Sequence, residues 1–135
     1  MENVSLVFQE TVTKTQMVPW DYDVYDIQVA GQSIGGMVYR YGTKAQLQYC
    51  GHIGYHIDES YRGHGYAYQA LCLLEKVLSA KGIDHVRITC EKNNIPSKKT
   101  IEKLQVKTCY LEKNIKDEEF STPDGLWIYE IEVRK

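Results

Sequence analysis

Residues 51–70 read GHIGYHIDESYRGHGYAYQA, and this stretch joins two different periodicities of the chain. Residues 47–57, which overlap the start of this stretch, alternate between two faces as the residues of a strand do. One face would carry Tyr49, Ile53, Tyr55 and Ile57, and the other would carry Gln48, Cys50, His52 and His56. From Tyr66 to Lys81 apolar side chains recur at helical spacing, and Gly82 is a typical helix stop. The stretch therefore predicts a strand, a glycine-containing turn and a helix in direct succession.

The flanking segments complete a mixed α/β pattern. Residues 4–9 are expected to form a strand, residues 24–30 and 33–41 a hairpin that turns at Gly31, and residues 85–90 another strand. A second helix is expected from Asn94 to about Leu104, followed by strands at 108–113 and 125–134. Strands that flank a helix in this order favour a right-handed crossover. We expect one α/β domain over residues 1–135.

The composition narrows the possible environments and partners. The 135 residues are 43% hydrophobic and carry a formal net charge of −2, which gives no general attraction to nucleic acid. The first residues lack a signal-peptide pattern, and no apolar run approaches the ~20 residues that span a bilayer, so we expect a cytoplasmic protein without membrane contact. The four cysteines form no CxxC pair, and neither a metal site nor a redox dithiol is predicted.

The segment RGHGYA, residues 62–67, stands where the predicted strand gives way to the helix. A helix N-terminus presents backbone N–H groups and a partial positive charge, and Gly63 and Gly65 would let an anion approach them closely. Arg62 and His64 can add charge-assisted hydrogen bonds. The segment is neither a P-loop nor a dinucleotide fingerprint, because GxxxxGK[ST] is absent and Tyr68 replaces the third glycine of GxGxxG. It therefore predicts a phosphate cradle of another kind.

RGHGYA matches the motif RxxGx[GA] of the GNAT superfamily of acyl-coenzyme A dependent N-acyltransferases. The longer segments IGYHIDESYRGHGYAYQAL and HVRITCEKNNIPSKKTIEKL resemble the branch that contains the ribosomal-protein-alanine N-acetyltransferases, and the resemblance covers about residues 30–134. It implies the GNAT fold, with a central, mostly antiparallel sheet, flanking helices and a parallel strand pair, 47–57 and 85–90, that splays apart. It also implies transfer of acetyl from acetyl-coenzyme A directly to a primary amine, either of a protein N-terminus or of a small molecule.

The resemblance also implies which residues hold the acetyl-coenzyme A. The backbone near Tyr55 and Ile57 would pair with pantetheine, Asn94 would contact the pantetheine arm, and Ser97 would lie near the thiol. The pyrophosphate would meet the turn before the helix, which consists of Arg62, Gly63, His64, Gly65, Tyr66 and Ala67. The lysine-rich segment 91–107 suits the phosphates of the same ligand.

The proton transfers need titratable side chains. A histidine is a reasonable base for an ammonium at neutral pH, so His52 and His56 are the candidates. For the leaving thiolate, Ser97 is the candidate donor, because the tyrosine that many members carry seven residues after the motif asparagine is Ile101 here. Tyr110 or Tyr129 on the closing strands remains an alternative acid. Catalytic metal is not expected, since the two histidines have no apparent third ligand.

Two departures from the family concern the acceptor side and the turn after the second helix. Only about fifteen residues separate the first two strands, which is enough for a loop, whereas the family usually places two helices there. EKLQV at 102–106 replaces the usual EKLGF. An acidic cluster, Asp21, Asp23 and Asp26, is expected either in a hydrated loop or near the acceptor. A non-catalytic acyl-coenzyme A binding or regulatory module therefore stays an alternative, and a homodimer is left open.

Overall fold

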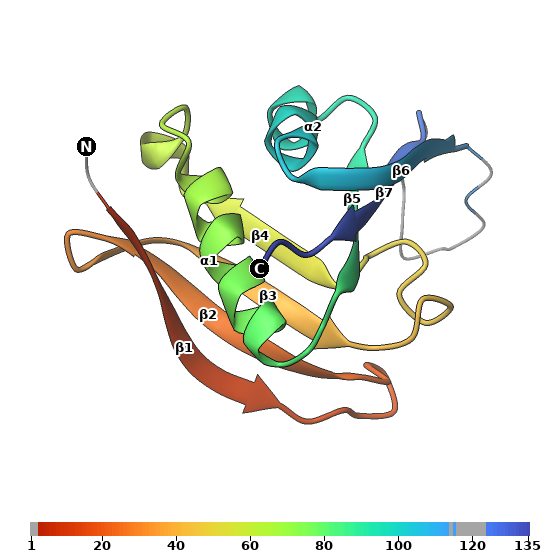
Figure 1. Cartoon of the computed structure of the whole chain (residues 1–135), viewed down its shortest axis with the longest axis horizontal. Helices are drawn as coiled ribbons and strands as arrows, with labels where there is room; N and C mark the ends of the chain where they lie inside the picture. The colour runs from red at the N-terminus through yellow and green to blue at the C-terminus, as the bar shows by residue number, and fades with distance from the viewer. Residues whose placement is uncertain (1–2, 114, 116–123) are drawn as a thin grey trace.

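The computed structural model describes residues 3–113, 115 and 124–135, and its strands form two antiparallel sheets (Figure 1). The first sheet has the order β1-β2-β3-β4, with β1 at Val4–Val12, β2 at Asp21–Val29, β3 at Gln32–Tyr41 and β4 at Ile53–Ile57. The second has the order β5-β7-β6, with β5 at His85–Glu91, β6 at Gln105–Glu112 and β7 at Leu126–Glu132. The helices are α1, Tyr66–Ala80, and α2, Ile95–Glu102, and a short 3-10 turn, Glu59–Tyr61, precedes α1.

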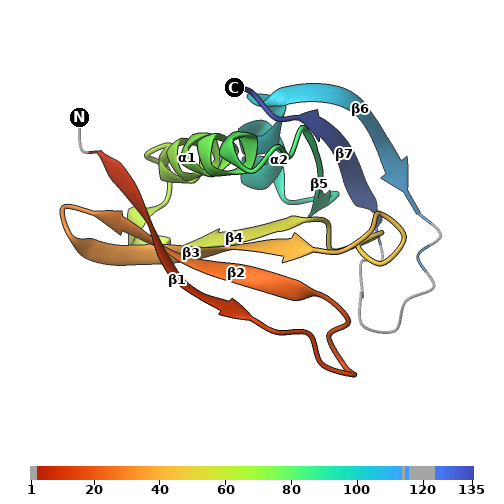
Figure 2. The same ribbon diagram turned by 60° about the horizontal axis from the view of Figure 1, so that its bottom comes forward.

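The hydrophobic core lies between the first sheet and the helices. Figure 2 shows α1 and α2 on one side of the four-stranded sheet, with no described element packed against the other side. Alternate residues of β2, β3 and β5 and one stripe of α1 point into this layer, among them Ile27, Met37, Leu71, Leu74 and Ile88, each at most 1% exposed. This layered α/β arrangement with flanking helices is the fold class that the sequence predicts. In the described part of the chain, no helix is long and apolar enough to cross a bilayer.

The β2–β3 hairpin turns where the sequence predicts it. Val29 pairs with Gln32, so Ala30 and Gly31 alone form the loop. Both have positive φ, 52° for Ala30 and 77° for Gly31, which is the backbone of a type I′ turn. The twist of this turn matches that of the two strands, and the turn sets their pairing as far as Gln28 and Ser33, where the register shifts.

The strand predicted at 47–57 is too long. The structure has turns over 44–50 and a strand only at Ile53–Ile57, so the first half of the prediction is wrong. Leu47 is fully buried, its N–H bonds the carbonyl of Thr43 at 2.9 Å, and the N–H of Gly51 bonds the carbonyl of Leu47 at 3.0 Å. Gly51 then reverses the chain with a φ of 71°. An alternating sequence was compatible with both conformations, and the tertiary burial of Leu47 selected the turns.

The segment between β1 and β2, residues 13–20, contains no helix, as predicted. The acidic cluster lies on β2 and not in a loop. Asp23 is only 3% exposed and accepts hydrogen bonds from the hydroxyls of Thr11 at 2.6 Å and Tyr41 at 2.5 Å. The Lys81 ammonium at the end of α1 lies 3.3 Å from the same carboxylate. The expectation of a hydrated or substrate-attracting acid is therefore wrong for Asp23, which ties α1 to three strands.

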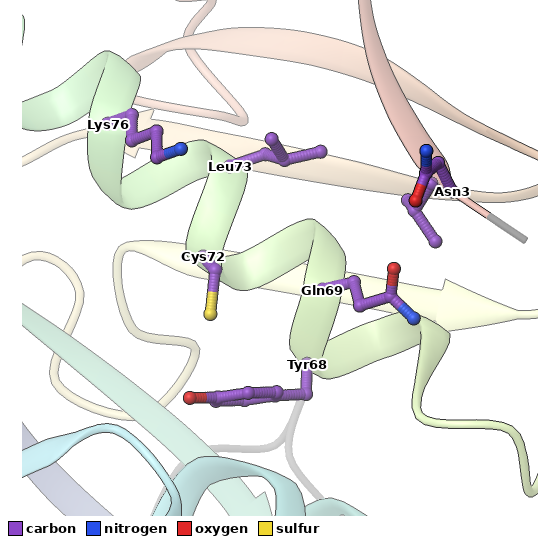
Figure 3. Close-up of a pocket in the computed structure, with 7 residues that line it drawn as sticks. Asn3, Tyr68, Gln69, Cys72, Leu73 and Lys76 are labelled. Carbon is purple, nitrogen blue, oxygen red and sulfur yellow. The ribbon is translucent and has the colours of Figure 1, made fainter. Parts of the chain in front are cut away.

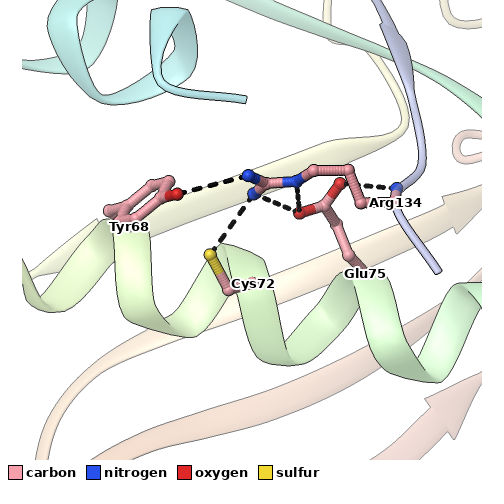
Figure 4. Close-up of polar contacts among 4 residues, drawn as sticks. All are labelled: Tyr68, Cys72, Glu75 and Arg134. Atoms are coloured by element: carbon pink, nitrogen blue, oxygen red, sulfur yellow. Dashed lines mark hydrogen bonds and ion pairs between the residues drawn. The ribbon is translucent and has the colours of Figure 1, made fainter. Parts of the chain in front are cut away.

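A second buried acid ties α1 to the segment after β7. Glu75, 5% exposed, accepts two hydrogen bonds from the Arg134 guanidinium, at 2.6 and 3.0 Å, and one from its backbone N–H at 3.0 Å. The same guanidinium reaches the Tyr68 hydroxyl at 3.3 Å and the Cys72 sulfur at 3.4 Å (Figure 4). These contacts hold the last described residues against the helix.

Candidate functional site

Strands β4 and β5 separate after His52, and the space between them is called the slot below. The N–H of His52 donates to the carbonyl of Arg87 at 2.8 Å, and the N–H of Arg87 donates to Nδ1 of His52 at 2.9 Å. Beyond this point β4 belongs to the first sheet and β5 to the second (Figure 1). The predicted splayed strand pair is therefore confirmed, and no described strand pairs with the edge of β4 that faces β5. The backbone of Tyr55 and Ile57 lies on this strand.

The turn before α1 leaves room for a ligand. Gly63 and Gly65 have φ values of 85° and 76°, and a Cβ atom added at either position would meet nothing within 4 Å. Any side chain there would occupy the open space in front of the helix. Nε of Arg62 donates to the carbonyl of Ile57 at 2.8 Å, which fixes the turn to the end of β4.

The electrostatics of this turn favour an anion. Helix α1 has no side-chain cap at its N-terminus and no acidic residue in its first turn, so its dipole is not compensated there. Exposed His64 lies beside Tyr66, with ring centroids 5.4 Å apart, and Ala67 follows in the first turn of the helix. A glycine cradle at the N-terminus of a 15-residue helix fits a phosphate group.

Across the slot, α2 supplies a polar group close to β4. Asn94 caps α2, with its Oδ1 accepting from the N–H of Ser97 at 3.2 Å. The Ser97 Oγ lies 2.9 Å from the Tyr55 hydroxyl, which bridges α2 and β4. On β5, burial raises the pKa of the Cys90 thiol to about 11, and a hydrogen bond with Ser97 opposes this rise. Ser97 therefore stands where β4, β5 and α2 meet.

His52 is not on an open polar face, contrary to the expectation for this position. Its side chain is buried, with 8% exposed, and its ring stacks near Tyr39 with centroids 6.0 Å apart. Burial lowers the pKa of His52, although a hydrogen bond with the backbone of Gly42 opposes the effect. With Nδ1 already bonded to Arg87, His52 is a neutral residue that joins the two strands.

His56, unlike His52, is exposed to solvent. Its side chain is 68% exposed, and Nε2 lies 3.9 Å from a carboxylate oxygen of Asp58. It pairs with Gly36 across the first sheet, and a Cβ atom at Gly36 would come within 3.0 Å of the His56 ring. Because strand side chains alternate, His56 and Tyr55 point to opposite faces of β4, and His56 lies on the face away from the helices.

The other polar features lie outside the slot. Lys98 pairs with Glu102 at 2.7 Å and lies 4.9 Å from the ring centroid of Trp127, and Lys107 pairs with Glu132 at 3.2 Å. A pocket of about 440 Å³ lies between α1 and the start of β1 (Figure 3), lined by Asn3, Val4, Tyr68, Gln69, Cys72, Leu73 and Lys76. Among the described residues, no group of three or more His, Cys, Asp or Glu side chains has a metal-binding arrangement.

The splayed strands, the glycine cradle before α1 and the asparagine-capped α2 together define the acyl-coenzyme A dependent N-acyltransferase fold. A sequence model described as an acetyltransferase (GNAT) domain matches residues 6–107. The chain belongs to this acetyltransferase family, and the predictions of the family and of an enzyme of N-acetyltransferase type are confirmed. No curated protein matches the sequence.

Solved structures agree with the family. The ligand-free RimL ribosomal L7/L12 alpha-N-protein acetyltransferase superposes with a TM-score of 0.63 at 20% identity, covering 83% of this chain and 70% of its own. An acetyltransferase of Salmonella typhimurium that modifies the N-terminal serine of ribosomal protein L7/L12 gives 0.62 at 21%, covering 84% and 64%. The microcin C7 self-immunity acetyltransferase MccE, bound to acetyl-CoA and AMP, gives 0.62 at 18%, covering 83% and 61%. At these identities the likeness shows the fold, and this chain spans less than two thirds of the last two proteins.

Sequence reasoning missed the contact between Tyr55 and Ser97. The two residues are 42 positions apart, and nothing local in the sequence signals that their hydroxyls meet. The alternation of residues 53–57 does place Tyr55 on the inward face of its strand, and a search for polar groups on that face would have drawn attention to it.

Proposed function

We propose that the chain is an acetyl-coenzyme A dependent N-acetyltransferase that passes acetyl directly to a primary amine. The observation that carries the proposal is the combination of three features: the open cradle at Gly63 and Gly65, the edge of β4 with which no described strand pairs, and the hydroxyl of Ser97. A ligand with phosphates at one end and a thiol at the other matches the chemistry of these features.

The proposed contacts are described from the phosphates of the ligand to its pantetheine arm. Pyrophosphate oxygens would accept hydrogen bonds from the backbone of residues 62–67, with the side chains of Arg62 and His64 at the rim. The amides of the pantetheine arm would pair with the backbone of Tyr55 and Ile57, as an added strand pairs with a sheet edge. Asn94 would contact the same arm from the start of α2.

Direct transfer, without an acetyl-cysteine intermediate, is proposed because the thiol of Cys90 is a poor nucleophile. The thioester supplies an activated acetyl group, and a cysteine would have to be ionised to capture it. Burial raises the pKa of the Cys90 thiol to about 11, so it stays protonated at neutral pH. Ser97 is then the group that can protonate the departing thiolate.

His56 is the proposed base. It lies on the face of β4 that no described element covers, so an amine can reach it directly or through one water molecule. His52 is proposed to hold β4 and β5 together at the start of the slot. The acceptor is a primary amine, either of a protein N-terminus, as in the Salmonella neighbour, or of a small molecule.

Two measurements test this proposal. Isothermal titration with coenzyme A should give a 1:1 complex, and the melting temperature should rise with ligand concentration. Release of free thiol from acetyl-coenzyme A should then depend on an added amine, tested with N-terminal peptides, polyamines, aminoglycosides and amino acids.

The outcomes separate the alternatives. Binding without turnover on any amine would favour the non-catalytic acyl-coenzyme A module, which gains support from Ile101, a fully buried residue at the family's tyrosine position. A melting temperature that stays constant at millimolar coenzyme A would refute the ligand assignment itself.

A further inference from the structure

We propose that Tyr55 is the positioning residue that makes Ser97 a proton donor to the thiolate. The inference rests on the proposed function and deepens it at the same site. The reaction needs a group that protonates the thiolate. The position where many family members carry a tyrosine for this step holds Ile101, which is 0% exposed and packs in the core. The proton must therefore come from another side chain.

The contacts of Ser97 determine where its own proton points. Its Oγ lies 2.9 Å from the Tyr55 hydroxyl. A serine hydroxyl has two acceptor lone pairs and a single proton. When Tyr55 donates to Ser97, the proton of Ser97 stays available to point into the slot.

The rest of the site keeps the Tyr55 hydroxyl protonated and Ser97 in place. Burial raises the pKa of Tyr55, and burial raises that of Cys90 to about 11, so neither group ionises at neutral pH. The backbone of Ser97 is held by Asn94, whose Oδ1 accepts its N–H at 3.2 Å. Tyr55 itself is packed against the core on the inward face of β4. The hydroxyl pair is thus a preorganised unit.

The proton transfer balances without any added reactant. The nitrogen of the amine forms a bond to the acetyl carbon, the bond between that carbon and sulfur breaks, and its electron pair stays on the sulfur. Ser97 gives its proton to the sulfur, the Ser97 oxygen takes the proton of Tyr55, and the Tyr55 oxygen recovers a proton from water. The proton lost by the amine leaves through His56 or solvent.

The test compares Tyr55→Phe, Ser97→Ala and the double variant with Tyr41→Phe as a control. Tyr41 lies in the Asp23 cluster, away from the slot, so removing its hydroxyl should lower stability and leave kcat unchanged. Tyr55→Phe should lower kcat about tenfold with an unchanged KM for acetyl-coenzyme A, and it should have no further effect in a Ser97→Ala background.

A second readout does not depend on activity. Urea unfolding of the wild type, the two single variants and the double variant should show a coupling between Tyr55→Phe and Ser97→Ala, while calorimetry gives the same coenzyme A affinity for all four. Additive losses in kcat, or a loss confined to KM, would overturn the inference while the proposed function stands. A wild-type protein that binds coenzyme A but acetylates no amine would overturn both.

Discussion

Gly65 and Gly82 stand at opposite ends of α1 with almost the same backbone, at φ values of 76° and 77°, and neither would bring a Cβ atom within 4 Å of another group. They differ in their position relative to the helix. Gly65 opens the proposed phosphate cradle, whereas Gly82 ends the helix. The pair therefore separates the effect of backbone strain from the effect on a ligand.

We expect Gly65→Asp to weaken coenzyme A binding by about 100-fold or more, roughly 3 kcal/mol, because the new carboxylate would face the phosphates. Gly82→Asp introduces the same strain at the other end of the helix and should leave the affinity unchanged. Isothermal titration of both variants measures the difference. Equal affinities for Gly65→Asp and the wild type would place the phosphates elsewhere.

The two histidines of the β4 region should respond differently to substitution. His56→Gln should lower kcat by about 100-fold, since it deletes the proposed base. His52→Gln should lower the free energy of unfolding by about 1–3 kcal/mol through the lost contact with Arg87. Rate measurements and urea titrations check the two expectations. An unchanged kcat for His56→Gln would make solvent the base.

At the scale of elements, the local patterns predicted helix α1 and the β2–β3 hairpin because short-range rules decide both. The stripe Ala70, Leu71, Leu74 and Leu78 is buried as its spacing predicts, and Gly31 turns the hairpin. Segment 44–50 could not be predicted in this way, since its turns depend on the burial of Leu47, a tertiary contact. In the candidate site, the glycines followed from the motif, whereas the hydroxyl pair of Tyr55 and Ser97 depends on how α2 packs beside β4.

The contact between α1 and Arg134 gives a prediction at the same scale. Arg134→Met should lower the free energy of unfolding by about 3 kcal/mol, because the carboxylate of Glu75 would stay buried without its cation. The double variant Glu75→Leu with Arg134→Met removes both charges and should recover part of this loss. Chemical denaturation of the three proteins provides the measurement. If the double variant were less stable than Arg134→Met, the ion pair would not be the source of the effect.

For the whole molecule, the Asp23 cluster links stability to pH. Burial alone would raise the pKa of Asp23, but hydrogen bonds from Thr11, Tyr41 and Lys81 together lower it below its usual 3.8. A carboxylate whose pKa is lowered by folding stabilises the protein above its unfolded pKa, and this contribution is lost as the pH falls through the folded value. Hydrogen bonding to Tyr41 also raises the pKa of Lys81 to about 12, so the pair is intact through neutral and mildly alkaline pH.

We therefore expect Asp23→Asn to destabilise the protein by about 1–3 kcal/mol at pH 7 and by clearly less at pH 2. Urea unfolding of the wild type and the variant across this range measures the two differences. A constant difference would mean that the loss comes from packing and not from the charge. The network itself was not predictable, since the sequence shows three acids within six residues and no sign of which one is buried.

The order β5-β7-β6 places the last strand in the middle of the second sheet. Because β5 and β6 have no ladder with each other, this sheet cannot assemble during synthesis until residues 126–132 have left the ribosome. The first sheet can pair earlier, since its neighbouring strands are also consecutive in the chain. Until β7 arrives, the nascent chain would expose the inward side chains of β5, including Val86, Ile88 and Cys90, to chaperones.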